Sequence, residues 1–302
     1  RYNPQFRGLP IVVGADPKGG LGRGVVSTAS YAARKFGIRS ALPISQAWRL
    51  AEAAREKGEP ETIFLNGNHA LYREVSERIM TILKQASDIF EQASVDEAYL
   101  EWNFQNTNSK SQTDWWRKAR ERAIVIKRKI LEQEGLTCSI GIGPNKLIAK
   151  ISSDFKKPDG LTVVRSDEVQ KFLNPMPIRA IPGIGPKTET VLHGHGVFTI
   201  GNLQHIDCAE LVATFGKWGR DLYEKSLGID DSPVSNEWEP KSIGEKETFE
   251  RDTLQAAFIL ERAQELATSV FRRFVQEGFN SWRTTVITVR FADFTTMTRS
   301  RT

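Results

Sequence analysis

The sequence is poor in cysteine and has no long hydrophobic run. Its 302 residues include two cysteines, Cys138 and Cys208, which cannot supply a framework of several disulfides or a zinc site with four cysteine ligands. No apolar run approaches the roughly 20 residues that cross a membrane, and residues 1–5 lack the apolar core of a signal peptide. These absences argue against a disulfide-rich secreted protein and a membrane protein, and they favour a reducing compartment.

Two familiar nucleotide-binding motifs are also missing. The glycine-rich segment 14–24 does not have the spacing of a dinucleotide fingerprint, and segment 181–188 fails the P-loop spacing because Pro186 intrudes. His193 and His195 form a pair, but two histidines alone do not make a metal site.

The charge that is present is concentrated in one segment. The chain carries 42 Lys and Arg against 37 Asp and Glu, a net charge of +5. Residues 115–157 contain eleven basic and four acidic side chains, so this segment nets +7 and the remainder nets −2. Such a cluster indicates either a polyphosphate or nucleic-acid partner, or a solvent-exposed helix face. At roughly 100–200 residues a domain, the length predicts two or three domains.

Hydrophobic periodicity predicts an α+β chain. Up to residue 164 the expected elements are strands 11–13 and 25–28, helices 30–36, 45–57 and 70–85, a hairpin over 89–102, a helix from the cap Thr113 to about Glu134, strand 138–142, helix 145–155 and strand 161–164. The order ββαβαβ over 89–164 describes helices on one face of a mainly antiparallel sheet.

The remainder of the chain has a different character. Residues 166–230 are predicted to be helical with short loops, which indicates a separate small domain. A polar linker follows at 231–236. After it we expect a strand over 242–249, a helix over 253–277 and a strand over 284–291.

Asp96 and Glu97 are adjacent acids at the turn of the predicted hairpin. Two neighbouring carboxylates repel each other unless a cation neutralises them. Hard divalent cations such as Mg²⁺ take carboxylate oxygens as ligands. Adjacent acids also occur in ordinary exposed turns, so the pair alone leaves both interpretations open.

Two further groups suit a phosphate. Tyr31 and Arg34 are three residues apart on the predicted helix 30–36 and share a face, and a guanidinium beside a hydroxyl can bind phosphate oxygens. The turn 158–160 (Pro-Asp-Gly) would hold Lys157 in a defined place. The alternatives are an exposed Arg beside a half-buried Tyr, and a solvated lysine.

Segment 181–188 (IPGIGPKT) indicates a helix-hairpin-helix. Gly183 and Gly185 lie between short predicted helices, and backbone N–H groups at a helix start can bind a DNA phosphate, with Lys187 close by. Segment 215–220, which contains Lys217, is interpreted as a second, degenerate copy. A purely structural glycine hairpin is the alternative.

Five segments together resemble the Y-family (translesion) DNA polymerases, most of all the polymerase IV branch. In order they are 28–37 (TASYAARKFG), 94–100 (SVDEAYL), 139–146 (SIGIGPNK), 157–160 (KPDG) and 181–185 (IPGIG). The resemblance covers essentially the whole chain, and the ordered set is much more specific than any single motif.

The resemblance implies an α+β multidomain, right-hand-like polymerase. Its parts would be small fingers over 1–68, a ferredoxin-like palm over 69–165, a helical thumb with the helix-hairpin-helix over 166–232, a linker over 233–241 and an α+β little finger over 242–302. The family's N-terminal palm strand, another metal-binding Asp and an aromatic residue that excludes ribonucleotides would precede Tyr2. We therefore expect a longer chain, in which the little finger also continues beyond Thr302.

The implied reaction is template-directed, low-fidelity DNA synthesis past damaged bases in DNA repair, by nucleotidyl transfer from a dNTP to a primer 3′-hydroxyl. Asp96 would bridge two Mg²⁺ ions, and Glu97 would hold the ion that activates the hydroxyl. The triphosphate would be held by Thr28, Tyr31, Arg34 and Lys157. The DNA backbone would be held by Gly183, Gly185, Lys187 and Lys217.

The expected partners are primer–template DNA, a dNTP and a sliding clamp that binds a C-terminal tail, with no membrane and no oligomer, so the protein would be a monomer. The expected location is the cytoplasm at the nucleoid, or the nucleus in a eukaryote. The main alternative is a non-catalytic DNA-binding scaffold that has lost the first metal Asp. A metal-dependent nuclease is a further alternative, but the sequence offers no extra acid cluster or catalytic His for it.

Overall fold

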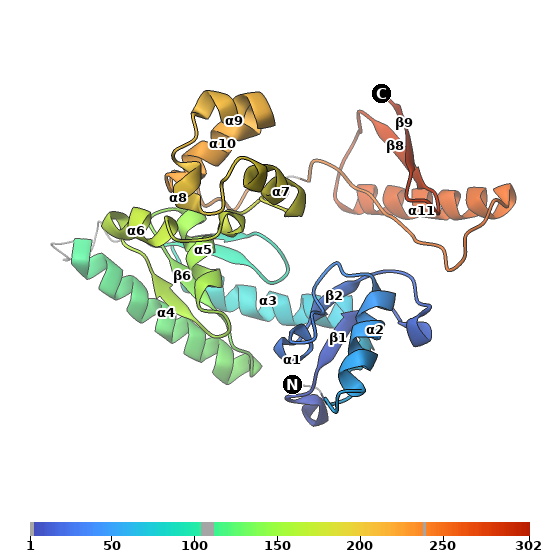
Figure 1. Ribbon diagram of the computed structural model, residues 1–302, viewed down its shortest axis with the longest axis horizontal. Helices are drawn as coiled ribbons and strands as arrows, with labels where there is room; N and C mark the ends of the chain where they lie inside the picture. The colour runs from blue at the N-terminus through green and yellow to red at the C-terminus, as the bar shows by residue number, and fades with distance from the viewer. Residues whose placement is uncertain (1–2, 104–111, 238–239) are drawn as a thin grey trace. The chain divides into compact units, whose positions relative to one another are not determined.

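The computed structural model describes residues 3–103, 112–237 and 240–302 (Figure 1). The chain forms two compact units, one spanning His69–Trp238 and the other combining Tyr2–Asn68 with Glu239–Thr302. In the described ranges, no helix combines the length and apolar character that a membrane crossing requires.

The segment Tyr2–Asn68 is built on a three-stranded sheet in the order β2-β1-β3, in which β1 is antiparallel to β2 and parallel to β3. Its elements are η1 (Pro4–Phe6), β1 (Ile11–Gly14), η2 (Lys18–Gly20), β2 (Val26–Ala29), α1 (Tyr31–Arg34), α2 (Ile44–Arg55) and β3 (Ile63–Asn66). Val12 and Ile44 are fully buried in its core. The predicted strands and helices are confirmed, but β3 was missed because four residues give too short a periodic signal.

The segment Glu239–Thr302 contains α11 (Ala256–Gln276) and the antiparallel pair β8 (Thr285–Arg290) and β9 (Thr296–Arg301). The predicted helix and the strand over 284–291 are confirmed. The predicted strand over 242–249 is wrong, because β8 pairs with β9 and segment 242–249 has no strand partner among the described residues. Two ion pairs join this segment to Tyr2–Asn68 within the same unit: Lys18 lies 2.8 Å from Glu250, and Arg23 lies 2.6 Å from Asp252.

In the unit His69–Trp238, the ββαβαβ order predicted for residues 89–164 follows helix α3 and is confirmed. The elements are α3 (His69–Gln85), β4 (Ile89–Gln92), β5 (Ala98–Glu101), α4 (Gln112–Glu134), β6 (Ile140–Ile142), α5 (Lys146–Phe155) and β7 (Leu161–Val163). The prediction of one mainly antiparallel sheet is wrong. In the described part of this unit, β4 and β5 form an antiparallel pair, and β6 and β7 form a separate parallel pair, because the crossover helix α5 connects β6 to β7. Thr113 is not the cap of α4, since the helix begins one residue earlier, at Gln112, which is a good helix former.

Helix α4 packs through one apolar face. Ala119, Ala123, Ile126 and Ile130 are all buried, against β6 and β7 along one stretch and against α3 and the hairpin along another. At the C-terminal end of α4, the Glu134 carboxylate accepts two 2.9 Å hydrogen bonds from the Arg78 guanidinium. This ion pair joins α3 to the buried face of α4. The solvent-exposed face of α4 carries many basic side chains.

The rest of this unit is helical, as predicted: η3 (Ser166–Glu168), α6 (Val169–Leu173), η4 (Ile178–Ala180), α7 (Pro186–Gly194), α8 (Ile200–Leu203), α9 (Cys208–Phe215) and α10 (Lys217–Ser226). Its buried cluster includes Leu173, Leu192 and Leu222, and it also includes Leu147 and Ile148 from α5. Helix α5 therefore belongs to the core of the helices that follow it as well as to the β6–β7 layer.

Candidate functional site

The hairpin turn between β4 and β5 presents two acids to solvent. The last pair of the ladder joins Gln92 to Ala98, so Asp96 and Glu97 lie in the connecting turn, where both are exposed. The Ser94 hydroxyl donates to the Asp96 carboxylate (2.8 Å) and accepts from the Asp96 backbone N–H (3.2 Å). These bonds fix the direction of the Asp96 side chain before any ligand arrives.

Helix α5 places a line of alternating charges beside the acidic turn. Lys150 donates a hydrogen bond to the Glu97 carboxylate and lies 3.6 Å from Asp154, one helical turn away. Asp154 in turn holds the Lys157 ammonium at 2.6 Å. The order Glu97, Lys150, Asp154, Lys157 therefore brings an acid of the predicted metal pair and the predicted phosphate-binding lysine into one network.

Electrostatics keep Lys150 charged in this network. Burial by itself lowers the pKa of Lys150, but the hydrogen bond to Glu97 and the negative charge of Asp154 outweigh burial, so the pKa lies above its ordinary value. A charged ammonium against Glu97 shows that the acidic turn is a place where positive charge is stabilised.

The acidic turn fits a hard divalent cation. Its donors are carboxylate oxygens, it is open to solvent, and Mg²⁺ is commonly held by one or two carboxylates with water and substrate phosphates as the other ligands. In the part of the chain that the structure describes, no cluster of three or more His, Cys, Asp or Glu side chains could hold a metal. Asp96 and Glu97 could therefore supply only part of the ligand set of such an ion.

Lys146, the other lysine of α5, is paired with an acid of the hairpin. The Lys146 ammonium donates to both oxygens of Glu91, at 2.8 and 2.7 Å, and lies 4.8 Å from the centroid of the Tyr99 ring. Glu91 also accepts from the backbone N–H of Ser235 (3.0 Å). Lys146 therefore fastens residues after α10 to the hairpin and does not project to solvent.

The predicted phosphate-binding residues of the other unit lie at the junction of β2 and α1. Ser30 caps α1 by accepting from Ala33 N–H, and Tyr31 begins the helix with 53% of its surface exposed. Arg34 donates from Nε to the Ala29 carbonyl (2.9 Å), and its guanidinium carbon lies 5.4 Å from the Tyr31 ring centroid. The shared face of Tyr31 and Arg34 is confirmed.

One bond anchors Arg34 and leaves the rest of the group available. Within the described part of the chain, the Arg34 Nη groups have no partner, so they can donate to an anion. Thr28 is exposed on β2, close in sequence to the same junction. Thr28, Tyr31 and Arg34 are thus three exposed polar residues within seven positions of one strand–helix connection.

The predicted helix-hairpin-helix has the expected backbone. The short helix η4 ends at Ala180, and α7 begins after Gly185 with Pro186 in its first turn. Gly183 has φ +100°, a conformation that other residues rarely adopt, and Ile184 is buried beside it. Lys187 is exposed at the start of α7, where free N–H groups and a positive charge favour an anion.

The predicted second copy is also a helical hairpin. Helices α9 and α10 meet at Gly216, which has φ +64°, and Lys217 is exposed at the start of α10. The helices approach closely at Gly219, where an added Cβ would lie 2.1 Å from the Leu211 carbonyl oxygen.

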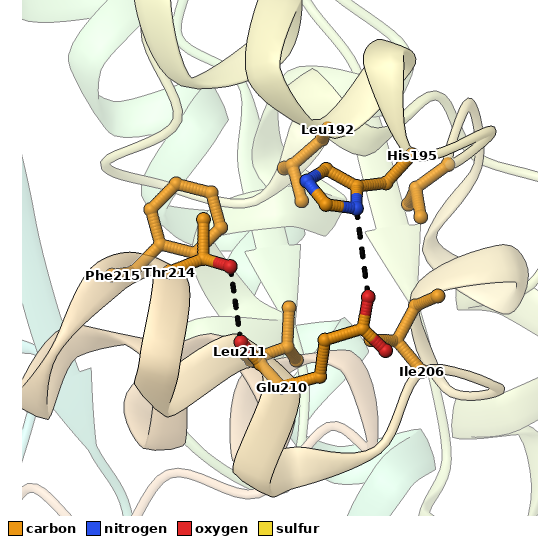
Figure 2. Close-up of a pocket in the computed structure, with 8 residues that line it drawn as sticks. Leu192, His195, Ile206, Glu210, Leu211, Thr214 and Phe215 are labelled. Carbon is orange, nitrogen blue, oxygen red and sulfur yellow. Dashed lines mark hydrogen bonds and ion pairs between the residues drawn. The ribbon is translucent and has the colours of Figure 1, made fainter.

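A small cavity lies between the end of α7 and α9 (Figure 2). Its volume of about 10 Å³ holds at most about one water, so it is not a substrate pocket. His195 lies at its edge, with Nδ1 3.5 Å from the Glu210 carboxylate. His193 instead packs on Phe198, with ring centroids 4.9 Å apart. Both histidines thus have structural neighbours in the helical region.

Sequence reasoning missed Lys150 and Lys146 as partners of the hairpin acids. The available signal was the spacing on the predicted helix 145–155, where Lys146, Lys150 and Asp154 recur every four residues and so share a face. The sequence could not show that this face lies against the hairpin.

Comparisons with known proteins cover the whole chain. Models of the impB/mucB/samB family match residues 1–154, the family's HHH motif matches 166–197, and its C-terminal domain matches 240–302. The chain is 42% identical over 302 residues to the DNA polymerase IV of Methanoculleus marisnigri, covering 100% of this chain and 79% of that protein. It is 38% identical to the DNA polymerase IV of Streptococcus mutans, with coverage of 100% and 77%.

Solved structures agree with this result. A chimera of the Y-family DNA polymerases Dbh and Dpo4 superposes with a TM-score of 0.82 at 31% identity, covering 99% of this chain and 82% of that one. An insertion ternary complex of Dbh DNA polymerase superposes with a TM-score of 0.69 at 31% identity and the same coverage.

Proposed function

The chain belongs to the impB/mucB/samB family of Y-family DNA polymerases, and on this premise we propose how its residues synthesise DNA. It is a DNA-directed DNA polymerase of the translesion type and depends on divalent metal. We propose that it transfers a nucleotide from a dNTP to a primer 3′-hydroxyl with two Mg²⁺ ions held in part by Asp96 and Glu97. The observation that carries the proposal is the network from Glu97 through Lys150 and Asp154 to Lys157.

The bound ions would act as Lewis acids that stabilise the attacking and leaving oxygens. The protein's part is to hold its own groups in place. Ser94 orients Asp96, and Lys150 forms ion pairs with Glu97 and Asp154. Lys157 is held by Asp154 at 2.6 Å. From there its ammonium would bind the triphosphate of the dNTP and would then offset the charge that develops on the leaving pyrophosphate.

The triphosphate would also contact the β2–α1 junction. The Arg34 guanidinium is anchored through Nε, so its Nη groups can donate to phosphate oxygens with little loss of conformational freedom. Tyr31, whose ring lies 5.4 Å from the Arg34 guanidinium carbon, and the exposed Thr28 would each add a hydroxyl. Primer extension by the protein tests the proposed reaction directly, because a DNA-binding scaffold would not lengthen a primer.

Replacing Arg34 by Met should raise the apparent KM for dNTP by about tenfold to a hundredfold, since a hydrogen bond to a charged group contributes about 1.5–3 kcal/mol. The measurement is steady-state incorporation of one nucleotide across a dNTP titration. Arg39→Met is the matched control, because Arg39 is exposed on the loop after α1 and should leave KM unchanged. Equal KM values for the two variants would remove Arg34 from the triphosphate site.

We propose that the DNA backbone binds at the hairpin formed by Gly183, Gly185 and Lys187, and at Lys217 on the second hairpin. Backbone N–H groups and lysines read phosphates and not base sequence. Binding should therefore weaken as salt increases and should differ little between primer–templates of different sequence.

Lys187→Glu should weaken primer–template binding several-fold at low salt, and it should reduce the slope of log K against log salt by about 1. Fluorescence anisotropy with a labelled primer–template at several salt concentrations measures both quantities. Lys171→Glu, a charge reversal at an exposed lysine of α6, is the control. If both variants bind alike, the assignment of DNA contacts to the α7 hairpin is wrong.

A further inference from the structure

Lys127 is a lysine of α4 whose side chain turns away from the basic surface of that helix. Only 17% of its side chain is exposed, and it follows the buried residue Ile126. Lys127 is one of the basic residues counted in segment 115–157. In the structure its ammonium lies against the backbone at Cys138 and at residues 159–160.

Four oxygens converge on the Lys127 ammonium. It donates to the carbonyls of Cys138, Asp159 (3.0 Å) and Gly160 (3.4 Å), and it also contacts the Asp159 carboxylate. An ammonium has three N–H donors, so these acceptors use its whole capacity. Three carbonyl oxygens that point at one place repel each other unless a positive charge lies between them.

The turn that Lys127 holds is the one that carries Lys157. Asp159 adopts φ +54°, an uncommon conformation for a residue with a side chain. The Gly160 N–H donates to the Ser139 hydroxyl (3.1 Å), and the Gly160 carbonyl accepts from Ile140 N–H (3.0 Å). The turn 157–160 is thus tied to the start of β6 on one side and to α4 on the other.

We propose that Lys127 is a positioning residue for Lys157: by holding the carbonyls of the 157–160 turn, it sets the place from which Lys157 reaches the triphosphate. The inference rests on the proposed role of Lys157. Removing the ammonium leaves the three carbonyls without their shared donor, and the turn relaxes. Lys157 then has to be ordered again each time a dNTP binds.

The test is a double-mutant cycle between Lys127→Met and Lys157→Met, measured by incorporation of a single nucleotide across a dNTP titration. Lys127→Met should raise the apparent KM for dNTP by about tenfold with a much smaller change in kcat. Lys129→Met is the matched control, because Lys129 lies on the same helix and makes one 3.4 Å contact to Gln85; its KM should stay within about twofold of the unaltered protein.

The cycle separates positioning from general loss of stability. If Lys127 acts through Lys157, adding Lys127→Met to Lys157→Met should change KM by less than about twofold. If Lys127→Met multiplies KM by its full factor in both backgrounds, the two residues act independently and the proposal is overturned. If Lys157→Met itself leaves KM unchanged, the triphosphate role of Lys157 fails, and this inference fails with it.

A milder variant covers the case in which Lys127→Met does not fold. Asp159→Asn removes the charge that faces Lys127 while keeping a side chain that tolerates positive φ, and Asp159 is half-exposed. Hydrogen exchange of segment 156–161 should become faster in this variant and KM should rise in parallel. Unchanged exchange and unchanged KM would overturn the proposal.

Discussion

Replacing either Asp96 or Glu97 by Ala should reduce primer extension at saturating dNTP and Mg²⁺ by more than about 100-fold. Mutating residues that merely orient a metal ligand typically costs 10–100-fold, so removing a ligand should cost more. The loss should appear in kcat, because both carboxylates lie on a turn held by its own hydrogen bonds and away from the buried core. Single-turnover extension with preformed protein–DNA complex measures it.

Glu101→Ala supplies the matched control for this loss. Glu101 is an exposed acid at the end of β5, in the same hairpin, and its replacement should leave extension nearly unchanged. DNA binding by the Asp96 and Glu97 variants should persist, since the proposed DNA contacts lie at the starts of α7 and α10, outside the β4–β5 hairpin. Extension that survives in both variants would reject the proposed metal site. If the unaltered protein binds DNA but does not extend a primer, the result would support the scaffold alternative.

Gly141→Ala should destabilise the unit His69–Trp238 by about 3 kcal/mol or more. An added Cβ would lie 2.1 Å from the Ala149 carbonyl oxygen and 2.2 Å from the Ser153 backbone nitrogen. Both atoms belong to the backbone of α5, so they cannot rotate out of the way, and the helix would have to move off β6. Overpacking of a well-filled core typically costs 1–3 kcal/mol and occasionally more.

Urea denaturation followed by circular dichroism measures this change. Gly194→Ala is the control, because Gly194 lies in α7 with nothing within 4 Å of the added Cβ. It should be neutral or slightly stabilising, since Ala is the better helix former. If both variants unfold at the same urea concentration, α5 does not pack on β6 as closely as the structure shows.

The sequence predicts most of the elements but not how the strands pair. Helices such as 70–85 were predictable because their apolar residues recur at helical spacing over four turns. The parallel pairing of β6 with β7 depends on α5 crossing between them, which hydrophobic alternation does not encode. Strand β9 was missed because it reads TMTRSR, with few apolar residues. Segment 242–249 was overpredicted from Ile243, Thr248 and Phe249, which favour a strand, but within the described part of the chain it pairs with no strand.

The candidate site was predictable only where local sequence carries the chemistry. Asp96 and Glu97 are adjacent in one turn, and Tyr31 and Arg34 share one helical turn, so spacing alone brings each pair together. Lys150 and Lys127 depend on packing between segments far apart in the chain. A count of charges assigned Lys127 to a basic surface, whereas its ammonium is covered by carbonyl oxygens.

The packing of helix α5 limits where homologous chains can be recombined without loss of function. One of its faces carries Lys150 beside the acidic hairpin, while Leu147 and Ile148 are buried with Leu173 and Leu222 from later helices. A chain cut after β7 would expose those two side chains to water. The acidic turn and its lysine therefore form a module only together with the helices up to α10 and the segment to Ser235, which is hydrogen-bonded to Glu91 of the hairpin. Recombination that preserves function should therefore cross over before α3 or after Ser235.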